Sequence, residues 1–178
     1  MNNKEEKQVQ MHKEFFDRCK HAIENGFYLE AILMEYAAIE SRLEAICGII
    51  GLPCGKDCHC RKDIMISTRI DCMRAFKHTN PSVFEKSKLP QNIFTRKGTL
   101  NNWIDKRNRI VHGLYKDELR YTGRVQNSQE LAEKGYEYVK LLYNEAKRIR
   151  RIKANHPDVF DCVIVHCENT KCQGYNEE

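Results

Sequence analysis

Apolar residues recur every three or four positions through most of the chain, and this helical period most constrains its fold. Between residues 28 and 50 they form a continuous stripe suited to burial along one helix face. The stripe consists of Ile32, Leu33, Tyr36, Ile39, Leu43 and Ile46. Weak two-residue alternation occurs in residues 159–165. The sequence therefore predicts an all-α protein with a short strand or an extended arm near its C-terminal end.

Residues that cap or break helices divide this pattern into about five helices. We predict them over residues 9–25, 28–50, 64–77, 99–113 and 128–154. Gly26 suits a left-handed C-terminal cap, Pro53 ends the second helix, and residues 81–97 read as irregular. Helices joined by short or moderate loops favour an up-and-down helical bundle. We assign residues 1–154 to this bundle and residues 155–178 to a short, irregular, cysteine-containing C-terminal tail.

Length and composition are those of one soluble domain. The chain has 178 residues, 41% of them hydrophobic and 31% charged, which suffices for a single core. The most apolar run, residues 45–52, is too short to cross a bilayer, and residues 1–7 begin no signal peptide. We therefore expect a cytoplasmic protein with no membrane partner. The net charge of +5 is compatible with an anionic partner and equally typical of a solvated surface.

Nine cysteines are many for a chain of this length. In a reducing cytosol, burial or metal binding is favoured over disulfides. Cys54, Cys58, His59 and Cys60 offer soft ligands in one loop, but structural zinc sites usually use two separated pairs. A second pair would have to come from Cys72 or the tail. We predict no cofactor, with a zinc-stabilised interaction protein as an alternative.

A charged residue stands on the apolar face of the helix predicted for residues 99–113. That face consists of Leu100, Trp103, Ile104, Val111 and Leu114. At about 100° per residue, Arg107 falls near its centre. A charge there costs several kcal/mol unless it is paired or hydrogen-bonded. Arg107 therefore either pairs with a carboxylate of the second helix, Glu40 or Glu35, or faces a cleft that admits an anion.

Asn108 and His112 lie four residues apart, which makes them neighbours on the flank of the same helix. A guanidinium, an amide and an imidazole brought together can bind a phosphate and move a proton. Imidazoles titrate near neutral pH, which suits proton transfer in either direction. These are the operations needed to cut RNA without a metal. The alternative is that His112 simply favours a helix C-terminus, ended here by Gly113.

Arg107-Asn108 followed by His112 resembles the Arg-Asn-x-x-x-His signature of the HEPN superfamily, and the helical layout of residues 9–154 is similar too. The resemblance implies a homodimer of helical bundles whose two motifs share one composite cleft. It also implies a metal-independent endoribonuclease of toxin–antitoxin, abortive-infection or CRISPR-associated systems. On that basis Arg107 would bind the scissile phosphate, His112 would act as general base or acid, and Asn108 would orient either. RNA would end in a 2′,3′-cyclic phosphate, and DNA would survive.

Further residues acquire roles from the same resemblance. Some toxin members carry a tyrosine two residues after the histidine; here that position is Leu114, and Tyr115 follows as a supporting residue. Glu40 is expected to brace Arg107. Candidate RNA-binding cations are Lys106, Arg109, Arg148, Arg150 and Arg151. A cognate antitoxin is a further partner that the resemblance implies. Because some members have lost nuclease activity, the alternative function is an inactive HEPN-like bundle that binds RNA, nucleotide or a protein.

Overall fold

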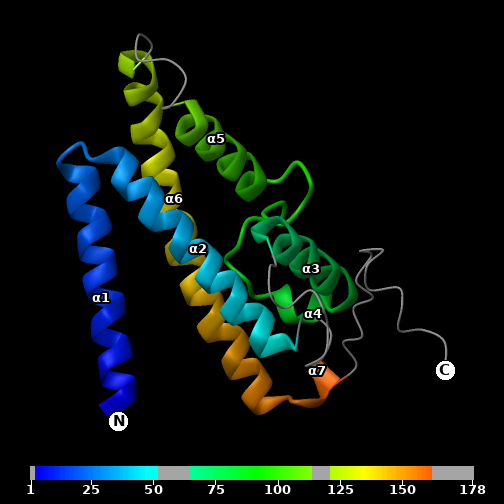
Figure 1. The fold of residues 1–178 in the computed structure, drawn as a ribbon. Coiled ribbons are helices and arrows are strands. Elements are labelled where there is room, and N and C mark those ends of the chain that lie inside the picture. Colours follow the sequence, from blue (N-terminus) through cyan, green and yellow to red (C-terminus); the bar gives the residue numbers. More distant parts are fainter. Residues whose placement is uncertain (1–2, 52–64, 114–120, 162–178) are drawn as a thin grey trace. The chain divides into compact units, whose positions relative to one another are not determined.

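The computed structural model describes residues 3–51, 65–113 and 121–161, and every element in these ranges is a helix (Figure 1). The helices are α1 (Asn3–Glu24), α2 (Tyr28–Ile50), α3 (Ile66–Thr79), α4 (Pro81–Phe84), α5 (Thr99–Gly113), α6 (Tyr121–Asn155) and α7 (Asp158–Asp161). The prediction of an all-α bundle is confirmed. None of these described helices combines the length and apolar character needed to cross a bilayer.

Two helices have the predicted bounds, and the others differ at their ends. α2 and α5 begin and end where the sequence indicated, whereas α1 and α6 both begin several residues earlier. Pro81, whose fixed φ suits a first helical position, begins α4 inside the segment predicted to be irregular. The predicted short strand or extended arm is wrong for residues 159–161, which belong to α7. Phe160 there stacks on Phe76 with ring centroids 6.0 Å apart, and residues 162–165 lie outside the described ranges.

The chain forms two compact units. Unit 1 consists of Met1–Ala38 and Trp103–Val139, and unit 2 of Ile39–Asn102 and Lys140–Glu178. Helices α2, α5 and α6 therefore each contribute residues to both units. The predicted tail, residues 155–178, lies largely outside the described part of the chain.

Unit 1 packs around the only tryptophan of the sequence, Trp103. Its indole N–H donates a hydrogen bond to the carbonyl of Leu131 at 2.7 Å, and its ring meets Tyr138 edge-on with centroids 6.5 Å apart. Buried residues from the helices of the unit complete the core. They are Cys19 and Ala22 of α1, Ala31 and Ile32 of α2, Ile104 of α5, and Ala132 and Val139 of α6. The hydrogen bond orients the Trp103 ring within this core.

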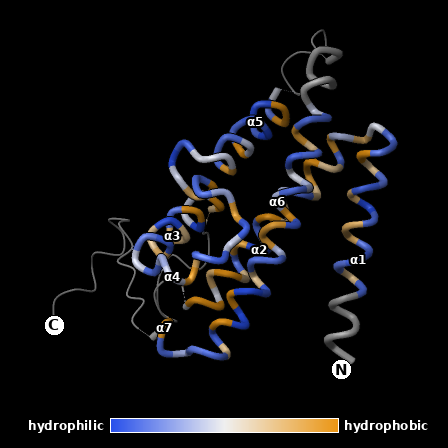
Figure 2. Tube along the Cα trace, turned by 180° about the vertical axis from the view of Figure 1, so that it is seen from behind, coloured by the Kyte–Doolittle hydropathy of each residue, from blue (hydrophilic) through white to orange (hydrophobic). Residues whose placement is uncertain are grey.

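Unit 2 has a core of aliphatic residues and phenylalanines. Figure 2 shows apolar residues recurring along α2, and five of those in its second half are fully or almost fully buried. They are Ile39, Leu43, Ile46, Cys47 and Ile50. Phe76 of α3 contacts Phe84 edge-on at 5.7 Å as well as Phe160. Within this unit the two long helices run parallel, because Arg42 lies by Tyr143 and Lys153 further along donates to the carbonyl of Ile49.

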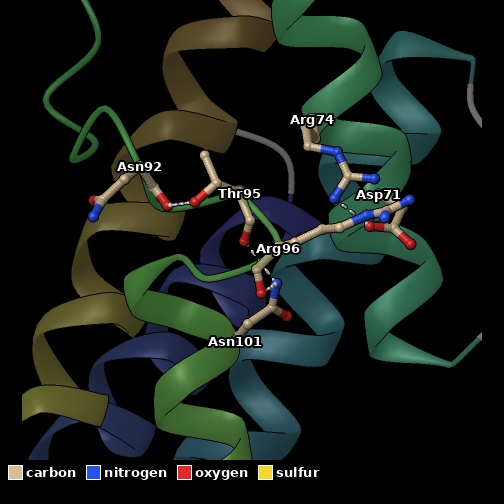
Figure 3. Close-up of polar contacts among 6 residues, drawn as sticks. All are labelled: Asp71, Arg74, Asn92, Thr95, Arg96 and Asn101. Atoms are coloured by element: carbon tan, nitrogen blue, oxygen red, sulfur yellow. Dashed lines mark hydrogen bonds and ion pairs between the residues drawn. The ribbon is translucent and has the colours of Figure 1, made fainter.

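A chain of polar contacts closes the turn before α5 (Figure 3). The Thr95 hydroxyl donates to the Asn92 carbonyl at 3.0 Å, and the Gly98 N–H donates to the Thr95 carbonyl at 2.9 Å. The Asn101 side-chain amide, one turn into the unit 2 end of α5, donates to the same Thr95 carbonyl at 2.8 Å. In Figure 3 the Arg96 side chain extends toward α3. The turn thus fixes where α5 begins.

Replacing Gly98 with alanine is expected to destabilise the protein by about 2 kcal/mol, because overpacking in a fixed backbone costs 1–3 kcal/mol. A Cβ at Gly98 would overlap the Asn92 carbonyl oxygen and lie 2.8 Å from the Thr95 carbonyl oxygen. Both are backbone atoms, which cannot rotate away. The free energy of unfolding in urea measures the effect.

Gly48→Ala is the matched control for Gly98→Ala. Outside the backbone of its own helix, no atom lies within 4 Å of a Cβ at Gly48, which is exposed in the last turn of α2. Helix propensity should make that variant more stable by up to about 1 kcal/mol. Equal urea midpoints for the two variants would contradict the steric account.

Each unit also contains a buried thiol. Burial raises the pKa of Cys19 to about 12, and the negative charge of Glu35 adds to the effect. Burial likewise raises the pKa of Cys47 to about 12, with a further contribution from Cys72. Thiols react as thiolates, so both side chains are inert while their surroundings stay closed.

Candidate functional site

Helix α5 places the arginine of the motif at the edge of a core. Trp103 and Ile104 are buried in unit 1, and Arg107 follows one turn later on the same face, half-buried. The structure therefore places the charge of Arg107 on the apolar face of α5, as the sequence indicated. Apolar packing holds the helix on one side of Arg107, while the next turn, up to His112, is more exposed.

Arg107 is held by an aromatic ring and an amide. Its guanidinium carbon lies 4.2 Å from the centroid of the Tyr36 ring, a cation–π contact between α5 and α2 within unit 1. Its Nη1 donates a hydrogen bond to the Asn108 side-chain oxygen at 3.0 Å. Its Nε is buried without a hydrogen-bond partner, and no described carboxylate lies within ion-pair distance of the guanidinium. The guanidinium is thus oriented without being neutralised by the residues described.

Glu40, expected to brace Arg107, pairs with a different arginine. Its carboxylate lies 3.4 Å from Arg69 of α3, and Glu44 lies 3.6 Å from the same guanidinium. Only 14% of the Arg69 side chain is exposed. The two carboxylates therefore offset the free-energy cost of burying its charge within unit 2. The signal that could have indicated this cluster is the spacing of Glu40 and Glu44, one helical turn apart.

Glu35, the other carboxylate considered for Arg107, lies in the core of unit 1. It is fully buried, and neither of its oxygens has a hydrogen-bond partner among the described residues. Burial raises the pKa of Glu35 to about 9, so it is neutral at pH 7. Gly135 of α6 makes room for it: a Cβ there would overlap the carboxyl group and lie 2.7 Å from the Trp103 ring. A neutral acid cannot cancel the charge of Arg107.

His112 lies in the last turn of α5 and is exposed. Asn108, one turn earlier, is half-buried. The His112 ring makes no hydrogen bond with any residue in the described ranges, so a ligand can approach it there. Lys106 and Arg109 of the same helix are exposed. Tyr115, named as a supporting residue, lies outside the described part of the chain.

The predicted basic run at the end of α6 does not act as one group. Arg148 donates two hydrogen bonds to the buried Glu145, at 2.9 and 2.5 Å, and its guanidinium carbon lies 6.0 Å from the centroid of the Phe84 ring. Its donors are thus already engaged in unit 2. Arg150 and Arg151 are exposed. The three-residue spacing of Glu145 and Arg148 is the sequence signal for the internal pair.

The zinc candidates Cys54, Cys58 and Cys60 lie outside the described residues. Within the ranges that are described, no three His, Cys, Asp or Glu side chains come together as a metal site. Comparison with known proteins adds no relative, since no family, curated protein or solved structure matches the chain.

Proposed function

We propose that the protein is a metal-independent endoribonuclease of the toxin or abortive-infection type, as its resemblance to the HEPN superfamily implies. The observation that carries the proposal is the state of Arg107. It is half-buried at the edge of an apolar core, oriented by Tyr36 and Asn108, and paired with no described carboxylate. An exposed histidine follows in the next turn. An oriented, unneutralised guanidinium beside an accessible imidazole suits a phosphodiester.

The proposed reaction needs no external nucleophile. Arg107 binds the scissile phosphate and stabilises the charge that develops on its oxygens. The 2′-oxygen of the preceding ribose attacks phosphorus, and the bond from phosphorus to the 5′-oxygen breaks. The 2′-hydroxyl loses one proton to a base, and the leaving 5′-oxygen gains one from an acid. In a homodimer with a shared cleft, two copies of His112 supply these two roles.

Asn108 is assigned an orienting role. Its side-chain oxygen accepts the hydrogen bond from Arg107, which leaves its amide N–H groups for other acceptors. A phosphate oxygen held by Arg107 is one such acceptor. Asn108 therefore restrains the guanidinium and offers a second donor to the same ligand.

The test is cleavage of single-stranded RNA by the purified protein in EDTA. We expect shorter fragments whose 2′,3′-cyclic phosphate ends are identified by mass spectrometry. Single-stranded DNA of the same sequence and 2′-O-methyl RNA should remain intact, because neither offers a 2′-hydroxyl for attack. Absence of cleavage across RNAs of varied sequence, or equal cutting of the DNA, would refute the proposal.

The second candidate is a catalytically inactive bundle that binds RNA, nucleotide or a protein partner. The observation that favours it is the His112 ring, which no described residue orients, whereas catalytic imidazoles are usually oriented by a second group. RNA binding without turnover in the same assay would support this candidate over the nuclease.

A further inference from the structure

The basic residues that end α6 divide into inward and outward sets. Arg148 binds Glu145, and Lys153 donates to the carbonyl of Ile49, so both are engaged inside unit 2. The outward residues are Lys147, Arg150 and Arg151, all of them exposed. At about 100° per residue, these three lie on one face of α6 together with Tyr143. This face points away from the unit 2 core.

Tyr143 brings cations from two helices together. The Lys147 ammonium lies 4.3 Å from the centroid of its ring, and the Arg42 guanidinium carbon, from α2, lies 5.9 Å from it. Both contacts are cation–π interactions, which orient the cations without cancelling their charge. Arg150 lies one turn beyond Lys147 on the same face. We refer to Arg42, Tyr143, Lys147 and Arg150 as the Tyr143 cluster.

No described acid neutralises the Tyr143 cluster. None of its three cations has an ion pair with a carboxylate in the described ranges. Among the same residues, the Arg42 side chain donates a hydrogen bond to the Ser41 hydroxyl at 3.3 Å. Burial lowers the pKa of Arg42, nearby Tyr143 opposes this, and the positive charge of Arg150 lowers it further. The cluster therefore concentrates mutually repelling positive charge, which a bound anion would relieve.

The acids of these two helices that belong to unit 2 pair with other arginines. Glu40 and Glu44 of α2 face Arg69, and Glu145 of α6 is buried against Arg148. The lack of a described carboxylate beside the three cations of the Tyr143 cluster thus reflects the arrangement of both helices within unit 2. An ordinary solvated surface intersperses charges of both signs.

We infer that the Tyr143 cluster binds the phosphodiester backbone of single-stranded RNA, which rests on the nuclease proposed above. The helical rise places Lys147 and Arg150 about 4.5 Å apart along the axis of α6, and Arg42 approaches from α2. This arrangement fits two or three successive phosphates. Tyr143 is half-buried and holds Lys147 and Arg42 near each other through its ring. The cluster recognises the negative charge of the phosphates, so the affinity that it contributes is independent of RNA sequence.

Binding is tested on the full chain with labelled 2′-O-methyl single-stranded RNA, which keeps the phosphates and cannot be cut. Neutralising three phosphates of a single strand gives log K against log salt a slope of about −2. The variant R42Q/K147Q/R150Q should lose most of that slope and about tenfold or more in affinity at low salt. The exposed pair K147Q/R150Q, which leaves the half-buried Arg42 in place, should show about two thirds of the change in slope.

The matched control is K86Q/K88Q/K97Q, which removes three exposed charges from unit 2 outside the Tyr143 cluster. It should bind within about twofold of the wild type. Equal losses in the two triple variants, or no binding by the wild type, would overturn the inference. If wild type cuts RNA but R42Q/K147Q/R150Q binds normally, the surface is wrong and the nuclease stands. If the cluster variant loses binding but wild type never cuts RNA, the surface stands and the nuclease fails.

Discussion

Replacing His112 with alanine is expected to lower RNA cleavage in EDTA by about 10²–10⁴-fold, the usual contribution of a positioned general acid or base. His112 is exposed and has no hydrogen bond with the described residues, so its removal should leave the fold intact. Affinity for uncleavable 2′-O-methyl RNA should be unchanged. The measurement is the single-turnover cleavage rate with a matched binding titration.

Two substitutions of Arg107 distinguish the role of its positive charge from that of its planar guanidinium. Arg107→Ala removes both, and Arg107→Lys keeps only the charge. Alanine should lower the rate by about 10²–10³-fold, and lysine should recover little of it, because an ammonium cannot offer two parallel donors to a phosphate. Combining Arg107→Ala with His112→Ala should cost far less than the product of the two effects, since residues that act on one step are not additive. His78→Ala, which removes an exposed histidine of α3, is the control. Equal activity of all these proteins would remove the proposed site.

Glu35→Gln is expected to change how stability depends on pH. In the folded protein Glu35 keeps its proton up to a pKa of about 9, against an ordinary value of 4.5. Between these values the folded state holds a proton that the unfolded state has lost, so stability falls as pH rises. The slope is about 1.4 kcal/mol per pH unit, or roughly 4 kcal/mol between about pH 5 and about pH 8. Because glutamine cannot ionise, the Glu35→Gln variant should not lose this stability as the pH rises.

Urea unfolding followed by Trp103 fluorescence measures the effect, because this single tryptophan belongs to the same core as Glu35. Wild type and Glu35→Gln should have similar midpoints near pH 5 and diverge toward pH 8, with the variant the more stable. Glu30→Gln, at an exposed position of the same helix, is the control and should follow the wild type. Parallel pH profiles for wild type and Glu35→Gln would show that Glu35 is ionised in the fold.

Helix positions could be predicted where apolar spacing and a stop signal coincide. Most of the apolar stripe of α2 is buried, although Leu33 is exposed. Gly26 before the helix and Gly51 after it adopt φ values of 77° and 82°, which favour glycine. The first turns of α1 and α6 carry no apolar stripe, so periodicity placed both starts too late. α7 was missed because the packing of Phe160 on Phe76, which supports it, joins residues far apart in the chain.

The candidate site could likewise be predicted only in part. Arg107 was found because its place on an apolar face depends only on residues of its own helix. Its partners could not be found, because periodicity does not say whether Glu35, Tyr36 or Glu40 faces α5. The structure places Tyr36 against Arg107, buries Glu35 and pairs Glu40 with Arg69. The Tyr143 cluster was missed for the same reason, since Arg42 joins it from another helix.

The buried thiols make the two units separately observable. Cys19 belongs to unit 1 and Cys47 to unit 2, and each can be alkylated only when its own surroundings open. Pulsed alkylation of the native protein, resolved by peptide mass, therefore reports two opening free energies in a single experiment. If the two rates respond to urea together, the units open as one cooperative body. If they respond separately, the long helices α2 and α6 permit one unit to open while the other stays closed.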